Sequence, residues 1–308
     1  QGTTVIYVSH RLDEVFAVAD HISVMRNGSL VFSEPTKDLD IPTVIQGIVG
    51  EKSAVSISKK NGSLDLHAKS GKVLEVKSIN NGTQVVDISL NVAAGEIVGV
   101  AGLIGSGADE LLETLFGARP KISGSVKVQG VEKEKLSPQN SVRDGIALIP
   151  ADRKRVGLMM ERSVSHNLSH VSVGGYKQGK ALISKSDFAK TAVKLVEKFD
   201  IKTEGVQVQV GHLSGGNQQK VVIGKWLEIG PGLVLLDDPT RGVDIGAKVE
   251  LFRLVREIAA EGKGILFRST EISELTTLCD RIVVVKDGIS TCEVSGVDDA
   301  ELIKLINE

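Results

Sequence analysis

Apolar runs of strand length, some continuous and some alternating with polar residues, occupy much of the segment from residue 73 to residue 130. They are VLEVKSI (73–79), VVDISLNV (85–92), EIVGVAG (96–102) and GSVKVQG (124–130). Farther along, KSDFAKTAVKLVEKF (185–199) is amphipathic, with apolar residues at helical spacing at Phe188, Ala192, Leu195 and Phe199. The pattern predicts an α/β fold that begins with an antiparallel β portion.

The start of the chain recurs near its end. Residues 2–28 align without gaps with residues 262–288, so that Gly28 corresponds to Gly288 at an offset of 260. Both copies predict a strand, a short helix, a strand and a turn. The simplest interpretation is a protein of two homologous halves. The identical positions are Gly2, Ser9, Glu14, Asp20, Ile22, Val24 and Gly28, repeated at Gly262, Ser269, Glu274, Asp280, Ile282, Val284 and Gly288.

Domain boundaries follow from this repeat. The chain begins at Gln1 and enters the strand-like run TTVIYVS (3–9) at once, which indicates a fragment. Residues 51–72 are polar, with Ser, Lys and Gly and few large apolar side chains, and are typical of a linker. We therefore expect the tail of a first half over residues 1–50, a linker over 51–72 and a complete second half over 73–308.

Composition narrows the function classes. A net charge of −2 gives no basic field that could hold nucleic acid or an anionic membrane. The cysteines, Cys279 and Cys292, form neither a metal-binding spacing nor a disulfide framework, which suits a reducing compartment. The longest apolar runs fall far short of the roughly 20 residues that span a bilayer.

A glycine-rich segment, GLIGSGAD (102–109), lies between a predicted strand and the helical pattern ELLETLFG (110–117). Gly102 and Gly107 have the spacing of a phosphate-binding loop, in which glycines let backbone N–H groups face phosphates at a helix N-terminus. However, Ala108 replaces the lysine of that motif, and Asp109 replaces the hydroxyl residue that holds Mg²⁺. A strand-to-helix turn without a ligand is the alternative interpretation.

A second motif, LVLLDDPTRGVD (233–244), is an apolar strand that ends in Asp237 and Asp238. A carboxylate at the end of a strand beside a phosphate loop can hold Mg²⁺, and the next one can orient water. A strand followed by a helix N-cap and a proline is the alternative.

The third motif is the most specific. LSGGNQQK (213–220) opens a helical run that stops at Gly230-Pro231. A serine hydroxyl and glycine N–H groups at a helix N-terminus form an anion site. Trp226 lies on the apolar side of this predicted helix and is expected in the core rather than against an adenine ring.

With these motifs the chain resembles the ATP-binding-cassette ATPases. It is most similar to the tandem ATPase subunits of bacterial monosaccharide importers, of the ribose, galactose and xylose type. That narrower resemblance rests on IPADRKRVGL (149–158), LSGGNQQKVVIGKWL (213–227), DDPTRGVDIGAK (237–248) and the layout of two halves. It implies a P-loop NTPase core with an antiparallel β subdomain and a helical subdomain.

The resemblance also implies roles for single residues. Asp237 is the metal-side carboxylate, Asp238 stands where the hydrolytic glutamate belongs, and His10 matches the switch histidine that grips the γ-phosphate. ATP and Mg²⁺ are the implied cofactors. In this family the LSGG segment contacts the ATP of the opposite half. The implied nucleotide-binding residues are Gly102, Gly105, Ser106, Gly107, Ala108 and Asp109 in the loop, and Leu213, Ser214, Gly215, Gly216, Asn217 and Gln218 in the signature segment.

The departures from the family pattern fall together in the second half. They replace the loop lysine (Ala108), the loop hydroxyl (Asp109), the glutamate (Asp238), the acid or amide of the DRK loop (Ala151) and the switch histidine, where Thr270 corresponds to His10. The LSGGNQQ segment is intact. We therefore expect one hydrolytic site, which uses His10 and residues 213–218, and one degenerate site built on this half's own loop.

The implied partners are the first ATPase half, membrane permease chains and, indirectly, a sugar-binding protein, but no nucleic acid. The implied location is peripheral, on the cytoplasmic face of the inner membrane. Two other classes remain open: a non-hydrolysing regulatory or scaffold module, and a soluble ATPase of the same superfamily outside transport. The second of these is disfavoured because no heptads and no basic extension appear. The sequence does not identify the sugar.

Overall fold

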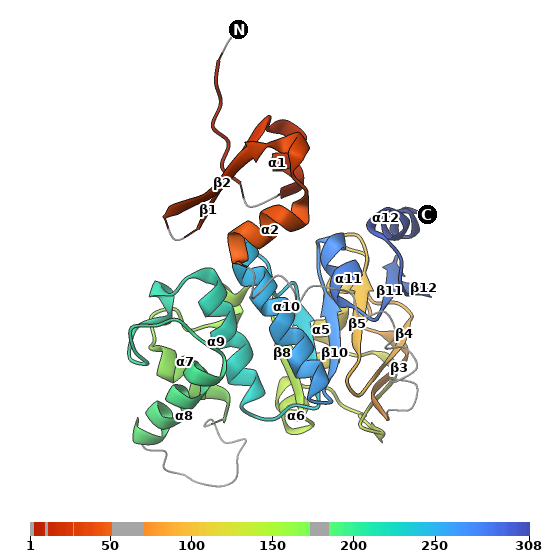
Figure 1. The fold of residues 1–308 in the computed structure, drawn as a ribbon. Coiled ribbons are helices and arrows are strands. Elements are labelled where there is room, and N and C mark those ends of the chain that lie inside the picture. Colours follow the sequence, from red (N-terminus) through yellow and green to blue (C-terminus); the bar gives the residue numbers. More distant parts are fainter. Residues whose placement is uncertain (1–2, 10–11, 27, 51–70, 173–184) are drawn as a thin grey trace. The chain divides into compact units, whose positions relative to one another are not determined.

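The computed structural model (Figure 1) describes residues 3–9, 12–26, 28–50, 71–172 and 185–308. These residues divide into two compact units, one of Gln1–Ser58 with Gly242–Leu254 and one of Lys59–Arg241 with Val255–Glu308. Each unit is described by itself. Residues 51–70, most of the predicted linker, lie outside the described residues, so that this boundary remains a prediction.

The first unit contains a β-hairpin, with helices before and after it. Strands β1 and β2 pair antiparallel, and Ile22 and Val24 of β1 are buried with Val44. The elements are α1 (Leu12–Val18), β1 (His21–Arg26), β2 (Ser29–Pro35), a 3-10 turn (Thr36–Asp38) and α2 (Ile41–Val49).

The repeat is visible in the bounds of the elements. Helix α11 (Ile272–Leu278) and strand β11 (Arg281–Lys286) lie at the predicted offset from α1 and β1, residue for residue. The hairpin partner of β11, β12 (Ile289–Val294), begins at the same offset from β2. The two copies therefore share a helix–hairpin unit.

The strand predicted over residues 3–9 is wrong, because the structure gives this segment no regular secondary structure. Its apolar side chains are exposed; Ile6, for example, is 89% exposed. The equivalent strand of the second copy, β10 (Gly264–Arg268), is hydrogen-bonded on both sides, to β5 and β9. A strand needs such partners for its N–H and C=O groups, and among the described residues the segment 3–9 has none.

The second unit contains the antiparallel β portion that the sequence predicts. A four-stranded sheet has the order β4-β3-β6-β7, and all of its pairs are antiparallel. Its strands are β3 (Lys72–Asn80), β4 (Ile88–Ala93), β6 (Ser123–Val128) and β7 (Val131–Glu132).

A second sheet, of six strands in the order β12-β11-β5-β10-β9-β8, forms the centre of the unit. All neighbouring pairs are parallel except β11 with the edge strand β12. The inner strands are buried on both faces, which explains their continuous apolar sequences. Besides β10, β11 and β12, the strands are β5 (Ile97–Ala101), β8 (Ile146–Ile149) and β9 (Leu233–Asp237).

Some helices of this unit pack against the sheet, while α7 and α8 pack against each other and against α9. In the view of Figure 1, α7, α8 and α9 gather at the left and β3 and β4 at the right. The helices are α5 (Ala108–Phe116), α6 (Pro138–Arg143), α7 (Val164–Val171), α8 (Lys185–Lys198), α9 (Gly215–Leu227), α11 and α12 (Asp299–Asn307). Helix α10 (Ile245–Ala260) has residues in both units.

Two predictions about helical side chains are confirmed. Ala192 and Leu195 of α8 and the following Phe199 are buried, as the amphipathic pattern requires, while the side chain of Phe188 lies outside the described residues. Trp226 of α9 packs against the main core, with its ring edge-to-face to Phe116 at a centroid distance of 5.6 Å. Among the described residues, no helix combines the length and the hydropathy needed to cross a bilayer.

Candidate functional site

The predicted loop residues 102–109 and the aspartates Asp237 and Asp238 lie where the central parallel strands end. In an open parallel sheet, ligands bind beside the carboxyl ends of the strands. Strand β10 lies between β5 and β9, so that the loop after β5, the aspartates at the end of β9 and residues 268–270 are neighbours. The topology thus brings together segments that lie far apart in the sequence.

The glycines of the loop are needed for its backbone path. Gly105 and Gly107 have φ values of 83° and 95°, a region that favours glycine. A Cβ at Gly107 would lie 2.4 Å from the carbonyl oxygen of Gln84, whereas a Cβ at Gly105 would meet nothing within 4 Å. The Gly288 N–H donates to the Ser106 carbonyl at 2.7 Å, which ties the loop to the β11–β12 turn. The predicted strand–loop–helix unit is therefore formed.

The start of α5 differs from a phosphate-binding site in its charges. Ala108, in the lysine position, is 1% exposed and belongs to the hydrophobic core. Its N–H donates to Ser106 Oγ at 3.4 Å. Asp109 and Glu110 follow in the first turn of the helix, where the helix dipole favours negative charge. Side chains therefore supply negative charge at the helix end where a phosphate would bind.

An arginine that the sequence analysis did not select joins the loop to β9. Arg268, the last residue of β10, lies opposite Asp237 in the register of the sheet. Its Nη1 donates to Asp237 Oδ1 at 3.1 Å, and its Nη2 forms an ion pair with Asp109 Oδ1. The Arg268 residue is only 8% exposed. The guanidinium therefore bridges Asp109, which stands in the position of the family's hydroxyl ligand, and Asp237, which stands in the position of the metal-side carboxylate.

Burial raises the pKa of Asp237 to about 6. The neighbouring charge of Arg268 opposes this shift, while Asp109 and Asp238 add to it. Near neutral pH the carboxylate is therefore largely ionised, and the ion pair with Arg268 is present.

Asp238 is held by the segment that follows β10. Its φ of 44° and its 4% exposure place it in a buried, left-handed turn. Thr270 donates to it from its hydroxyl, at 3.1 Å to Oδ2, and from its N–H, at 3.3 Å to Oδ1. Ser269 Oγ lies 3.4 Å from Oδ1. The carboxylate in the hydrolytic position is thus hydrogen-bonded to Thr270, the residue in the switch position.

The signature segment, residues 213–218, lies at the N-terminus of α9, which is partly exposed to solvent. Ser214 caps α9, and its hydroxyl accepts from the N–H and from the side-chain amide of Asn217, the latter at 2.9 Å. Ser214 is exposed, Leu213, Gly215 and Asn217 are half-buried, and Gly216 and Gln218 are buried. Gln218 Nε2 donates to the Leu213 carbonyl at 3.0 Å and so fixes the turn before the helix. The segment can present backbone N–H groups to an anion.

Ala151 and His10 are the other two positions at which the sequence indicates a role or a departure from the family pattern. Ala151 is half-buried just beyond the carboxyl end of β8, and its methyl group can accept or donate no hydrogen bond. Beside it, Arg153 Nη1 donates to the Arg241 carbonyl at 2.5 Å and joins the DRK loop to the PTRG turn. His10 lies outside the described residues.

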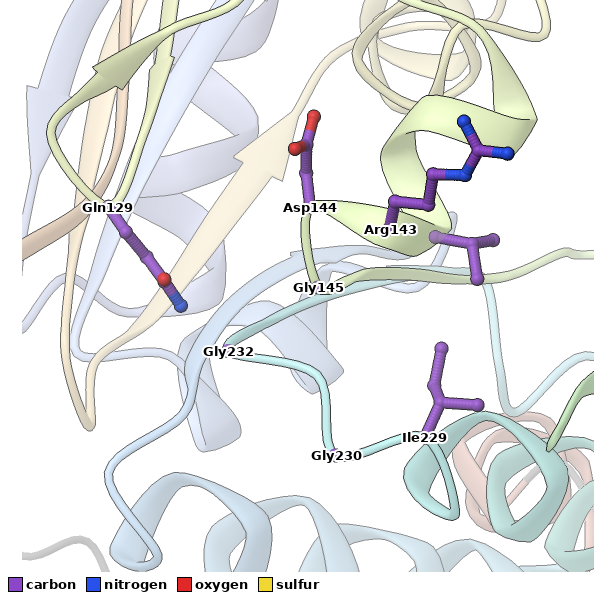
Figure 2. A pocket seen from close by; sticks show the side chains of 8 residues that line it. Gln129, Arg143, Asp144, Gly145, Ile229, Gly230 and Gly232 are labelled. Carbon is purple, nitrogen blue, oxygen red and sulfur yellow. The ribbon is translucent and has the colours of Figure 1, made fainter. Parts of the chain in front are cut away.

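A hollow of about 300 Å³ lies elsewhere in this unit (Figure 2). Gly145 and Gly232, which line it, directly precede β8 and β9. Figure 2 also shows Gln129, Arg143 and Asp144 around it. The hollow therefore lies at the amino ends of the parallel strands, away from the predicted site.

Comparison with known proteins agrees with this arrangement. The sequence profile of the ABC transporter family matches residues 85–241. The galactose/methyl galactoside import ATP-binding protein MglA of Clostridium perfringens (strain SM101 / Type A) is 35% identical over 301 residues, which cover 97% of this chain and 57% of that protein. The ribose import ATP-binding protein RbsA of Bacillus subtilis (strain 168) is 36% identical over 293 residues, with 95% and 58% covered.

Solved structures share the fold. An ATP-binding cassette of an ABC transporter in its ADP conformation superimposes with a TM-score of 0.64 at 20% identity, covering 77% of this chain and 95% of that one. A dimeric cassette in a post-hydrolysis state with ADP and Pi gives a TM-score of 0.62 at 21% identity, covering 73% and 99%. The α/β fold with an ABC-type nucleotide-binding domain is thereby confirmed. ABC ATPases bind nucleotide, generally with Mg²⁺.

The chain spans less than two thirds of the curated relatives it matches, 57% of MglA and 58% of RbsA. The family profile nevertheless covers half of the chain, including the loop after β5, the signature segment and the aspartates of β9. On this profile, the chain belongs to the ABC transporter family.

Proposed function

We propose that this chain is part of the ATP-binding subunit of a sugar importer and couples ATP binding and hydrolysis to carbohydrate transport. The support for transport is its similarity to MglA and RbsA, whose names assign them to galactose and ribose import. The proposed partners are membrane permease chains and, indirectly, a sugar-binding protein, and the proposed location is peripheral, on the cytoplasmic face of the membrane. The same similarity to import ATP-binding proteins supports both.

Within that subunit, residues 1–50 are the tail of one ATPase half and residues 73–308 are a second half. One contrast within the second half supports the proposal that the two halves have different roles. The signature helix α9 has an intact, capped and open N-terminus, whereas the loop before α5 has Ala108 in place of lysine and an acid at Asp109. The second half thus completes the ATP site of the first half, where His10 acts as the switch residue.

The loop of the second half has a poor environment for hydrolysis. Asp238 has one methylene less than the family's glutamate, and Thr270 and Ser269 already surround its oxygens. A water molecule placed for attack would need one of those oxygens within hydrogen-bonding reach. This half therefore holds ATP weakly or not at all and does not turn it over.

Uptake of labelled galactose and ribose in cells that produce the whole importer tests the proposal. Gly215→Glu places an acid at the N-terminus of α9 and removes an anion site, so uptake of the transported sugar should fall by about 10-fold or more. Lys304→Glu introduces an acid at an exposed position of α12, away from the N-terminus of α9, and is the control that should leave uptake unchanged. Normal uptake with a folded Gly215→Glu subunit would refute the role of the signature segment.

A further inference from the structure

We propose that the guanidinium of Arg268 is a built-in cation on the metal side of this half's phosphate site, so that no divalent metal ion binds there. The inference deepens the proposed function and rests on it for the identity of the loop at residues 102–107 as a phosphate site. The position of Arg268 among its carboxylates is a separate observation.

The geometry places one cation between two anions. Arg268 Nη1 lies 3.1 Å from Asp237 Oδ1, and Nη2 is ion-paired with Asp109. The side chains of Arg268 and Asp237 are 9% and 14% exposed, and that of Asp109 is 31% exposed. The two terminal nitrogens of the same guanidinium thus contact the first turn of α5, through an ion pair, and the end of β9, through a hydrogen bond.

The residues present do not fit Mg²⁺. Mg²⁺ requires near-octahedral oxygen ligands and is usually held through one or two carboxylates together with substrate phosphates. Here Asp109 replaces the hydroxyl ligand, and Asp237 is already paired with Arg268. In the described part of the chain, no group of three or more His, Cys, Asp or Glu side chains is placed to hold a metal ion.

Displacing the arginine would also be costly. A metal ion bound to both Asp237 and Asp109 would leave the guanidinium of Arg268 buried without its two partners, and an unpaired buried charge strongly destabilises a fold. An exposed arginine could turn into solvent instead, but this residue is only 8% exposed. The ion pairs therefore compete directly with metal binding.

The repeat supports a specific role for this arginine. At the offset of 260, the residue of the first copy that corresponds to Arg268 is Val8, and the residue that corresponds to Thr270 is His10. The strand positions before it stay apolar in both copies, as VIY in 5–7 and ILF in 265–267. The copy with the switch histidine thus has an apolar residue there, and the copy with the altered loop has the cation.

Metal binding without nucleotide tests the inference. The whole chain is titrated with Mn²⁺ and followed by electron paramagnetic resonance, and its melting temperature is measured with and without Mg²⁺. The wild-type chain should bind no Mn²⁺ at this site and show no shift. Arg268→Val, which installs the residue of the first copy, should bind Mn²⁺ and gain about 2–4 °C at roughly ten times the dissociation constant.

Two further variants test whether the gain in metal binding depends on the charge at residue 268 and on Asp109. Arg268→Lys keeps the positive charge and should behave like the wild type. Asp109→Asn in the Arg268→Val background removes one of the carboxylates and should abolish the gain. A folded Arg268→Val chain that binds no metal would overturn the inference.

The wild-type chain gives a second, independent result if Arg268→Val does not fold. If the wild-type chain binds Mn²⁺ and Asp237→Asn abolishes that binding, the inference is overturned. If the wild-type chain binds no Mn²⁺, the inference is supported. Because no nucleotide is present, this outcome is separate from the uptake test. Loss of uptake in Gly215→Glu together with Mn²⁺ at Asp237 would refute the built-in cation and leave the proposed function standing.

Discussion

The hydroxyl of Thr270 donates to Oδ2 of Asp238 at 3.1 Å. The first residue stands where the first copy has its switch histidine, and the second stands where the family has its hydrolytic glutamate. Two positions to which the family resemblance gives roles in ATP hydrolysis are thus hydrogen-bonded to each other here, in a turn where Asp238 is 4% exposed.

Thr270→Val should destabilise the chain by about 1.5–3 kcal/mol, because it removes a hydrogen bond to a buried carboxylate and leaves the shape almost unchanged. The free energy of unfolding in urea measures this. Thr276→Val removes the exposed hydrogen bond to Asp299 and serves as the control, with a cost below about 1 kcal/mol. Equal costs would mean that Asp238 does not depend on Thr270.

The two loop glycines should differ in their tolerance of alanine. Gly105→Ala requires only a left-handed φ in open space and should cost about 1–2 kcal/mol. Gly107→Ala requires the same and also places a Cβ 2.4 Å from the backbone of Gln84, which should add about 1–3 kcal/mol. Chemical denaturation of both variants measures the difference. Equal stability would show that the loop is not packed against Gln84.

A buried ion pair at the amino ends of β5 and β11 should contribute more to stability than a surface pair. Arg281 donates to both oxygens of Glu96, at 2.7 and 3.2 Å, and both side chains are under 10% exposed. Arg281→Met leaves the Glu96 carboxylate buried and unpaired and should cost about 3–5 kcal/mol.

The surface pair of Arg119 and Glu113 is the control for this prediction, because both side chains are about 40% exposed. Arg119→Met should cost less than about 1 kcal/mol. The double variant Arg281→Met with Glu96→Gln should recover part of the lost stability, since the buried charge is then absent. Additive costs in the double variant would contradict the coupling.

Lys225 should make stability rise at alkaline pH. Burial lowers the pKa of Lys225 from its ordinary 10.5 to about 8, and its ammonium group donates to the Gly157 carbonyl. Between pH 8 and pH 10.5 the unfolded chain holds this proton more tightly than the folded chain, so that stability increases with pH in that window.

The difference in unfolding free energy between the wild type and Lys225→Met isolates this group. It should shift in favour of the wild type by about 2 kcal/mol from pH 8 to pH 10. Urea denaturation at half-unit pH steps gives the curve. A difference that stays constant over this range would mean that Lys225 titrates normally in the folded chain.

Much of the fold follows from local pattern. The strand-length runs and the amphipathic helix report burial at their own positions, and β3, β5 and α8 form where these patterns lie. The segment 3–9 has the same kind of pattern without forming a strand. A strand also depends on neighbours that its own sequence does not contain, as the pairing of β10 with both β5 and β9 shows.

In the candidate site, too, some residues could be predicted from local sequence and others could not. Gly107 and Ser214 belong to short motifs with fixed spacing, and the structure places them at the N-termini of α5 and α9. The role of Arg268 had no local signal, because it ends an apolar strand and its partners, Asp109 and Asp237, come from distant parts of the sequence. Only the contrast with Val8 in the repeat could have marked it.

The most direct test of the central claim is a titration of this chain with a fluorescent ATP analogue and Mg²⁺, with phosphate release followed in the same samples. We predict weak or absent binding and no release, because Ala108 supplies no charge and Asp109, Asp237 and Asp238 together outweigh the single cation Arg268. Phosphate release that disappears in Asp238→Asn would contradict the account, because it would show that this half hydrolyses ATP with its own loop.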